Sequence, residues 1–140
     1  MVNRGFEIGL SEVAMHEQVG LLAYSPLAQG TLTGKYLGGQ MPQGSRLALF
    51  GDGPLMMRYK GDKTQQAIEM YVNLAKKYEI DPAQLAIQFC NIQPFVTSTI
   101  IGATTMEQLK TCIDSVDLDI TKEIMNEIRS IHKEIPNPAP

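Results

Sequence analysis

The chain has 140 residues, of which 44% are apolar and 19% are charged, and its formal net charge is −3. Such a composition is typical of one globular domain with a hydrophobic core and excludes an intrinsically disordered chain. The basic residues are scattered, and no stretch approaches the roughly 20 apolar residues that cross a bilayer, so we expect neither nucleic acid nor a membrane as partner. A small anionic ligand needs only a local pair of cations and is compatible with this charge.

The first predicted elements are a short helix and a strand. Ser11 is expected to cap the helix and Gly20 to end it. Residues 21–24, Leu-Leu-Ala-Tyr, are apolar at successive positions, which is typical of a parallel strand buried on both faces. The glycines and prolines between Gly38 and Pro54 predict a long loop.

Two helices and a second strand are predicted in the middle of the chain. Apolar residues recur at helical spacing from Thr64 to Tyr78. Asp81 and Pro82 are expected as N-cap and first residue of another helix. Residues 97–101 are mostly β-branched and predict a strand. The side chains that the second of these helices should bury are Leu85, Ala86, Phe89 and Cys90.

Two further helices complete the chain. Thr105 and Gln108 form a capping-box pattern at the start of the first, and Thr121 caps the second. Three prolines then predict an extended tail over residues 136–140. The predicted inward stripes are Leu109, Cys112, Ile113 and Val116 in the first helix and Ile124, Ile128 and Ile131 in the second.

The cysteines and histidines argue against several kinds of site. Cys90 and Cys112 fall within apolar helical stripes, and the apolar run of a signal peptide is missing, so we expect reduced thiols and a cytoplasmic protein. His16 and His132 fall on helices away from the strand ends and are expected at the surface or half-buried. We therefore expect no metal site, and the sequence contains no nucleophile elbow or Walker-type loop.

Two runs of small and polar residues follow the predicted strands. The first is Tyr-Ser-Pro-Leu-Ala-Gln-Gly-Thr-Leu-Thr-Gly-Lys-Tyr at residues 24–36, and the second is Ile-Gly-Ala-Thr-Thr-Met-Glu-Gln-Leu at residues 101–109. Strands that open into small residues expose backbone N–H groups, which can hold an anion. The strands are joined through helices, which is the pattern of β/α units in an α/β fold.

Together with Ser-Glu-Val-Ala-Met-His-Glu at residues 11–17, these runs resemble the C-terminal portion of an NADPH-dependent aldo-keto reductase of the bacterial branch. The resemblance covers residues 2–140. It implies the C-terminal part of a (β/α)8 TIM barrel, with residues 1–140 as a partial domain that ends in a Pro-rich tail at residues 136–140. A closed barrel has eight strands and roughly 250 residues. We therefore expect that six N-terminal strands were truncated, lost, or come from another chain.

The resemblance also implies a site for NADPH. Tyr24 matches the aromatic residue that stacks on the nicotinamide, although it also fits a strand-end core residue. Lys35 matches a cation on the phosphate side, although it also fits an ordinary solvated lysine. Gln108 matches a residue near the 2′-phosphate, although a helix cap also explains it. Cys112 departs from the family, which often has Asn for adenine there. The other phosphate-side positions are Ser25, Pro26, Leu27, Gly30 and Arg46, and those that hold the adenosine ribose and its 2′-phosphate are Gly102 and Thr104.

Carbonyl reduction needs a general acid beside the nicotinamide. In the family this is a Tyr supported by Lys, Asp and His, all from the N-terminal part of the barrel, so we expect no catalytic residue in this chain. A carbonyl substrate would then bind only with the missing N-terminal half. The alternatives are a non-catalytic nucleotide-binding or oligomerising half-barrel, which could associate with itself or a complementing chain, and a helical scaffold without ligand.

Overall fold

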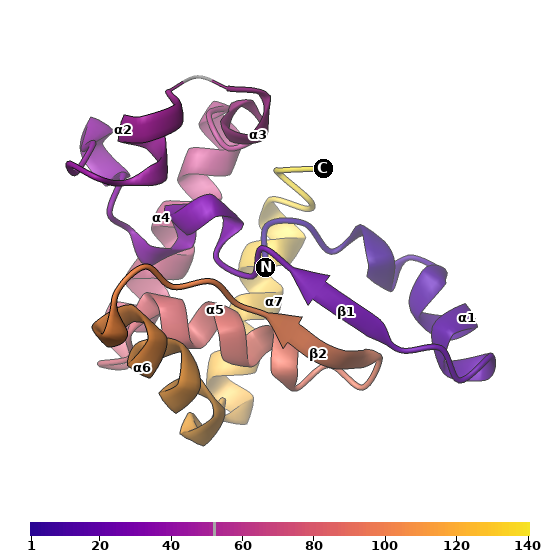
Figure 1. Cartoon of the computed structure of the whole chain (residues 1–140). Helices are drawn as coiled ribbons and strands as arrows, with labels where there is room; N and C mark the ends of the chain where they lie inside the picture. Colours follow the sequence, from indigo (N-terminus) through magenta and orange to yellow (C-terminus); the bar gives the residue numbers. More distant parts are fainter. Residues whose placement is uncertain (52) are drawn as a thin grey trace.

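A computed structural model describes residues 1–51 and 53–140 (Figure 1). It is an α/β structure, as predicted, in which strands β1 (Leu21–Tyr24) and β2 (Val96–Ile100) pair in parallel. Short 3-10 helices are η1 (Gly5–Glu7), η2 (Ala28–Thr33), η3 (Leu37–Gly39) and η4 (Ser115–Asp117). The α-helices are α1 (Leu10–His16), α2 (Arg46–Phe50), α3 (Pro54–Met57), α4 (Asp62–Lys77), α5 (Pro82–Asn91), α6 (Met106–Asp114) and α7 (Lys122–Glu134).

The register of the two strands contains an irregularity at Thr97. Leu21 pairs with Val96 and Leu22 with Ser98, so Thr97 is an extra residue in β2. The backbone of Gly20 approaches Thr97 so closely that a Cβ at position 20 would lie 1.6 Å from Thr97 Oγ1. Glycine is therefore required here by the neighbouring strand. The prediction that Gly20 ends the helix is wrong, because α1 ends at His16 with Glu17 as its C-cap.

The sheet is covered on one face only by the described part of the chain. Helix α5 packs against β2, and Leu21 and Ala23 on β1 are half-buried. On the other face Leu22, Tyr24 and Ile100 are 58%, 73% and 50% exposed. The prediction that residues 21–24 are buried on both faces is therefore wrong, because no described element covers the second face.

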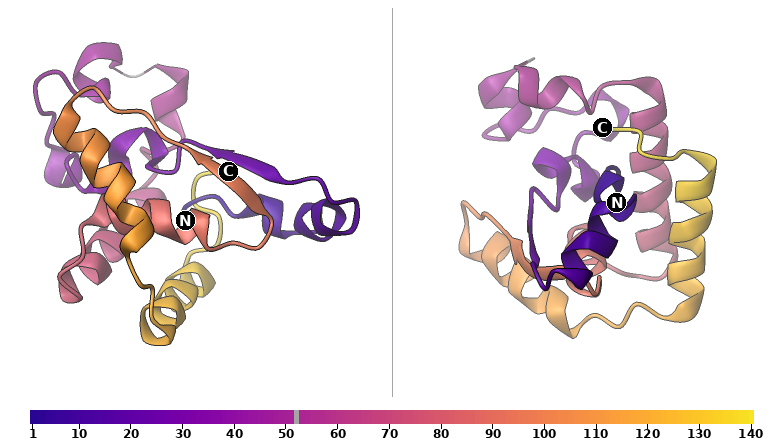
Figure 2. Two further views of the ribbon diagram at one scale, coloured as in Figure 1. Left: turned by 60° about the horizontal axis from the view of Figure 1, so that its bottom comes forward. Right: turned by 90° about the vertical axis from the view of Figure 1, so that its right-hand side faces the viewer.

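The core lies between α4, α5 and α7. Helices α4 and α7 lie side by side (Figure 2), and the predicted inward residues Ile124, Ile128 and Ile131 are all buried. On α5 the predicted burial is confirmed for Leu85, Ala86 and Phe89, whereas Cys90 is only half-buried. The other residues of this core include Ala67, Ile68, Tyr71, Val72 and Ala75 on α4 and Leu85, Ala86 and Phe89 on α5.

Helix starts that the sequence signalled locally are mostly confirmed. Asp81 Oδ1 accepts hydrogen bonds from Ala83 N at 2.8 Å and Gln84 N at 3.1 Å. Thr121 accepts one from Ile124 N. The expectation for Ser11 is wrong, because α1 already begins after Gly9 and the Ser11 hydroxyl, inside the helix, donates to a carbonyl of the preceding turn.

Two predictions about surface segments are also corrected. The loop expected from Gly38 to Pro54 contains α2, whose N-cap Ser45 accepts a hydrogen bond from Ala48 N; the residues near it include position 52, outside the described residues. Five residues form this helix, too few for an apolar period to reveal. In the α6 region Cys112 is buried, but Ile113 and Val116 are 56% and 61% exposed, since no described element packs on that side.

The Pro-rich segment at the C-terminus packs against the rest of the protein. Ala139 is fully buried, and its N–H donates to the Val2 carbonyl at 3.1 Å. The Thr64 hydroxyl donates to the Pro138 carbonyl at 2.6 Å, and Asn137 Oδ1 accepts from Arg4 N at 2.6 Å. Residues 136–140 therefore dock against α4 and the first residues of the chain, because those supply the hydrogen-bond partners.

His132 on α7 lies near the ion pair between Arg4 and Glu7. Its Nδ1 is buried and has no hydrogen-bond partner within the described part of the chain. Desolvation, and after it the Arg4 charge, lowers the pKa of His132 below its ordinary value of 6.5. The folded state therefore favours the neutral imidazole.

We expect the free energy of unfolding, measured by urea denaturation, to be lower at pH 5 than at pH 7.5. The unfolded chain binds the proton more readily, so the contribution of His132 is fully present above about pH 6.5 and is lost as the pH falls through the lowered pKa. His132→Gln should reduce the difference between the two pH values. His16→Gln is the control, since that side chain is 87% exposed. An unchanged pH dependence in His132→Gln would contradict this expectation.

Candidate functional site

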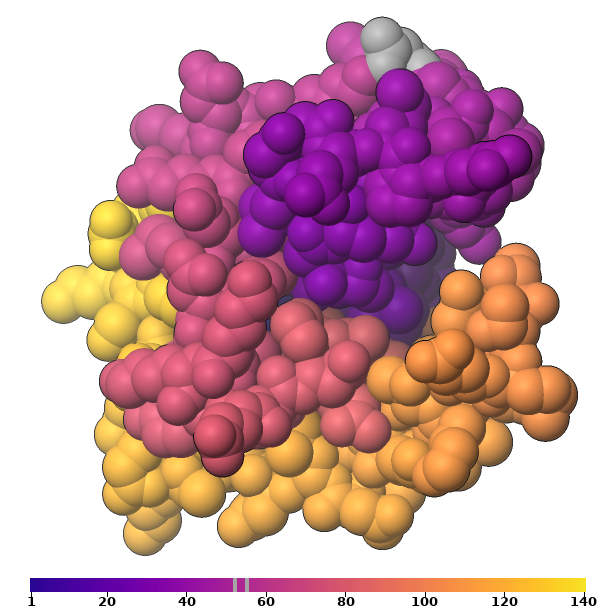
Figure 3. All heavy atoms as spheres, turned by 90° about the vertical axis from the view of Figure 1, so that its left-hand side faces the viewer, coloured from indigo at the N-terminus to yellow at the C-terminus, as the bar shows by residue number. Residues whose placement is uncertain are grey.

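The two predicted loops lie at the same edge of the sheet. Because β1 and β2 are parallel and Tyr24 pairs with Ile100, the loop at residues 25–35 and the loop at residues 101–108 both leave from the carboxyl ends of the strands. Figure 3 looks onto this edge, and the surface is hollowed between the two segments. Within the described ranges no hydrogen bond joins the loops, so their spacing is set by the sheet and by α5, which packs against both η2 and α6.

The first loop has an unusual backbone. Ser25, Ala28 and Gln29 have φ values of 53°, 50° and 60°, and Gly30 follows with 90°. Residues other than glycine rarely adopt this left-handed region, which costs about 1–2 kcal/mol each. Such strain is held by surrounding structure and is concentrated at functional sites.

Two threonines stabilise this conformation. The Thr31 hydroxyl donates to the Ala28 carbonyl at 2.8 Å, and the Thr33 hydroxyl donates to the Gly30 carbonyl at 2.8 Å. Ala28, Thr31 and Leu32 are buried, which anchors the loop in the protein. Neither threonine was predicted as a site residue, although their spacing of three residues from the carbonyls is typical of a side-chain turn. The loop is therefore shaped before any ligand binds.

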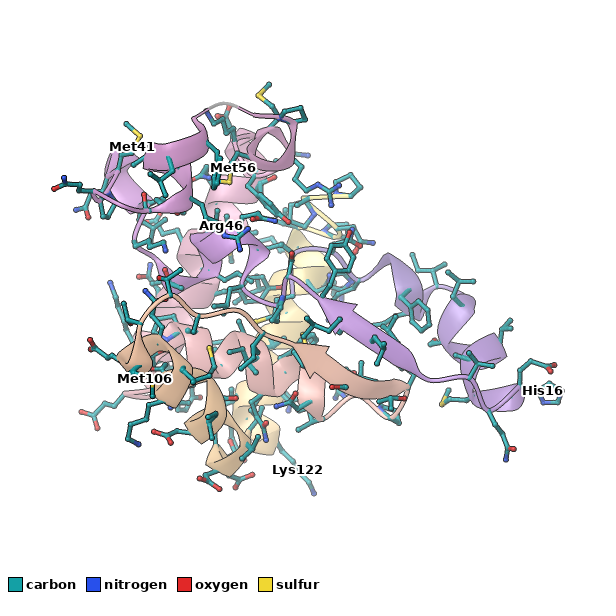
Figure 4. The ribbon with its side chains drawn as sticks, viewed as in Figure 1. His16, Met41, Arg46, Met56, Met106 and Lys122 are labelled. Carbon is teal, nitrogen blue, oxygen red and sulfur yellow. The ribbon has the colours of Figure 1, made fainter. Side chains whose placement is uncertain are left out.

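Two cations lie at the first loop, Lys35 within it and Arg46 on α2. Lys35 folds back over it, so that a Cβ on Gly30 would lie 3.0 Å from Lys35 Nζ. Arg46, at the start of α2, donates from Nη1 to Gln29 Oε1 at 2.6 Å (Figure 4). Neither cation belongs to the ion pairs found among residues 1–51 and 53–140, which leaves a local positive charge without a carboxylate. Those ion pairs are Arg4–Glu7, His16–Glu17, Lys77–Glu127 and Lys110–Asp114.

The remaining predicted residues of the first loop differ in exposure. Tyr24 is 73% exposed on the uncovered face of the sheet, so it is not a core aromatic in this structure. Ser25, Pro26 and Leu27 are half-buried, and Leu27 packs against the core. The loop thus presents one free aromatic ring and a fixed backbone at the strand end.

The second loop leads into α6. Thr105 caps this helix by accepting from Gln108 N at 3.2 Å, as predicted. The Gln108 side chain does not return to Thr105, as a capping box would have it. Its Oε1 instead accepts from Thr104 N at 3.0 Å and from the Thr104 hydroxyl at 3.1 Å. Gly102, Thr104 and Gln108 are all exposed at the amino end of α6, where the helix dipole favours an anion.

Cys112 does not face this loop surface. It is 6% exposed, and burial raises the pKa of its thiol. A buried neutral thiol does not replace a surface amide as a contact for a ligand base. Cys112 therefore differs from the asparagine of the family pattern both in its exposure and in its chemistry.

A pocket of about 290 Å³ lies behind the first loop. Tyr59 lies at its wall, and desolvation raises the pKa of its phenol. The phenol is thus protonated at neutral pH. No sequence pattern indicated this pocket, part of whose wall falls in the loop predicted from Gly38 to Pro54. The lining residues are Thr31, Tyr36, Gly39, Gln40, Leu47, Met56, Tyr59, Lys60 and Gln65.

Other kinds of site are not seen in the described residues. They contain no group of three or more His, Cys, Asp or Glu side chains placed to hold a metal ion. Their helices include none with the length and apolar character needed to cross a membrane. The chemistry of this part of the chain is therefore that of the two loops, with backbone amides, hydroxyls, one exposed aromatic ring and two cations.

The fold is shared with a solved oxidoreductase. The structure of the glycerol dehydrogenase from Gluconobacter oxydans superposes with a TM-score of 0.68 over 96% of this chain and 40% of that chain, at 21% sequence identity. This likeness bears on the fold alone. It confirms the prediction that the chain forms the C-terminal part of a (β/α)8 barrel.

Sequence comparison extends along the whole chain. Protein tas from Escherichia coli is 49% identical over 140 residues, which are all of this chain and 40% of that protein. An aldo-keto reductase from Babesia bovis is 37% identical over 132 residues, covering 90% of this chain and 46% of that protein. The chain thus spans less than half the length of these relatives. The model of the Aldo/keto reductase family matches residues 1–133, and the chain therefore belongs to this family.

Proposed function

We propose that this chain is the cofactor-binding part of an NADPH-dependent aldo/keto reductase, with residues 1–140 as a partial domain. The observation that carries the proposal is the pair of cations at a preformed loop, Lys35 in the loop and Arg46 hydrogen-bonded to it from α2, without a carboxylate partner in the described ranges. They lie at the same edge of the sheet as the amino end of α6. Such an arrangement favours a ligand with phosphates at two places.

We assign groups to the nicotinamide, to the pyrophosphate, and to the adenosine ribose with its 2′-phosphate. Tyr24, exposed at the end of β1, would stack on the nicotinamide. The second loop would hold the adenosine ribose and its 2′-phosphate through Gly102, Thr104 and Gln108. The residues that would hold the pyrophosphate are Ser25, Pro26, Leu27, Gly30, Lys35 and Arg46.

The magnitudes indicate which contacts dominate. A hydrogen bond to a charged group contributes about 1.5–3 kcal/mol, whereas an aromatic contact adds about 0.5–1.5 kcal/mol beyond its buried area. The phosphate contacts should therefore supply most of the affinity and the stacking should orient the ring. This ordering predicts that NADPH binds more tightly than NADH, because NADH lacks the 2′-phosphate.

The bound cofactor supplies a hydride for carbonyl reduction. This chain would position the nicotinamide with Tyr24 and hold the phosphates. The group that protonates the carbonyl oxygen, and the walls that bind the carbonyl substrate, would come from outside these residues. We place the protein in a reducing compartment, the cytoplasm, since Cys90 and Cys112 are both free thiols.

The test is a titration of the purified chain with NADPH, followed by cofactor fluorescence, with NADH as the control. Circular dichroism first establishes that the sample is folded. We expect saturable binding that favours NADPH and no turnover when an aldehyde is added. A folded chain that binds neither cofactor would overturn the proposal, and turnover by the chain alone would overturn the assignment of proton donation to other residues.

A further inference from the structure

Gln29 has a backbone conformation that glutamine does not favour. Its φ and ψ are 60° and 20°, in the left-handed region, and Gly30 beside it has a φ of 90°. Glycine adopts such angles without steric cost, and Asn or Asp enters the region more readily than Gln. We therefore expect the contacts of the Gln29 side chain to offset the free-energy cost of its backbone conformation.

The Gln29 side chain joins two separate elements. Its Oε1 accepts a hydrogen bond of 2.6 Å from Nη1 of Arg46, 17 residues along the chain, at the start of α2. Its Nε2 donates to Ser25 Oγ at 3.5 Å, at the end of β1. A guanidinium has only donors, so the amide must present its oxygen to Arg46, which determines the orientation of the amide. Both ends of the amide are thus engaged.

The group that accepts the hydrogen bond from Arg46 is a neutral amide, and this determines how much positive charge is left for a ligand. A carboxylate at this distance would compensate the guanidinium charge and compete with an anionic ligand. An amide oxygen engages one of the five N–H groups of the guanidinium. The full charge and the other donors stay available to a ligand. An exposed arginine otherwise loses rotamer freedom when it binds a ligand. Gln29 holds the guanidinium in place before the ligand arrives.

We propose that Gln29 is a positioning residue that orients Arg46 over the first loop for a phosphate group of the cofactor. The proposal rests on the proposed function and deepens it. The ligand atom that Arg46 would bind is a phosphate oxygen, which belongs either to the pyrophosphate or to the 2′-phosphate. Arg46 touches the ligand, and Gln29 acts through Arg46.

Two variants separate this role from a structural one. Gln29→Gly removes the acceptor and relieves the backbone, so the thermal midpoint should stay equal or rise, while NADPH binding weakens about threefold to tenfold. Gln29→Glu keeps the length of the side chain and adds a negative charge. Its binding of NADPH should be weaker than that of Gln29→Gly at pH 8 and should recover as the pH is lowered toward the pKa of the new carboxyl group.

Titrations with NADPH and NADH identify the phosphate. A loss confined to NADPH assigns Arg46 to the 2′-phosphate, and an equal loss with both assigns it to the pyrophosphate; both results support the positioning role. Arg46→Ala and the double variant Gln29→Gly/Arg46→Ala complete a cycle, in which removing Gln29 should have no further effect once Arg46 is gone. Unchanged affinity in both Gln29 variants, or additive losses in the cycle, would overturn the inference while leaving NADPH binding established. Failure of the parent chain to bind NADPH would overturn the proposed function and this inference together.

Discussion

Replacing Lys35 and Arg46 together with methionine should weaken NADPH binding by about 100-fold or more. Each cation is expected to make at least one charge-assisted hydrogen bond to a phosphate, and two such contacts combine to a factor on the order of 100. Methionine keeps an apolar stem of similar reach, so the packing of Lys35 over Gly30 and the Tyr36 ring is largely preserved. The measurement is the fluorescence titration with NADPH at two salt concentrations.

The matched control changes the net charge by the same amount elsewhere. Lys76→Met/Lys133→Met removes two exposed cations, one near the end of α4 and one near the end of α7. It should bind NADPH as the parent does. Salt should weaken binding to the parent and the control, and should have little effect on the residual binding of the Lys35/Arg46 variant, because exposed charges are screened. Equal losses in both double variants would show that general charge, and not the first loop, attracts the cofactor.

The largest effect on stability is expected for Ile128→Ala. Ile128 is fully buried on α7 against α4, so its truncation removes apolar contacts and leaves a cavity, which should lower the free energy of unfolding by about 2–5 kcal/mol. That is a large fraction of the total for a domain of this size, roughly 5–15 kcal/mol. Urea denaturation followed by circular dichroism at a fixed pH measures the change.

Ile113→Ala is the control for this substitution. It is the same change, also in a helix, but Ile113 is 56% exposed on α6. We expect a change of about 0.5 kcal/mol or less, as at other exposed positions. Comparable losses at the two positions would mean that α7 does not pack on α4 as the structure has it.

Helix boundaries show where local sequence is sufficient. The caps at Asp81, Thr105 and Thr121 were predicted because a capping hydrogen bond joins residues two or three apart. The prediction that Ser11 caps α1 was wrong because its residue type does not distinguish two positions. A serine fits an N-cap or an interior position, and the left-handed Gly9 before it, with a φ of 87°, determines where α1 begins.

Burial was harder to predict than secondary structure. An apolar stripe is the same in the sequence whether or not another element covers it, so Ile113 on α6 and Leu22 on β1 were expected inside and are exposed. Conversely, no sequence pattern indicated that Ala139, in the Pro-rich tail, is buried and donates a hydrogen bond to Val2 at the other end of the chain. These outcomes depend on partners far away in the sequence.

The sequence by itself determined the two strands, the caps of α5, α6 and α7, the inward face of α7, the family and the two loops that follow the strands. These features depend on residues close together in the chain, or on a motif of contiguous residues. Only the tertiary structure decided that the loops share one edge, which follows from parallel pairing of strands about 70 residues apart. It alone also showed the left-handed backbone of the first loop and the contact between Gln29 and Arg46. Backbone angles in a loop and hydrogen bonds between distant residues arise from packing around them, which no local pattern records.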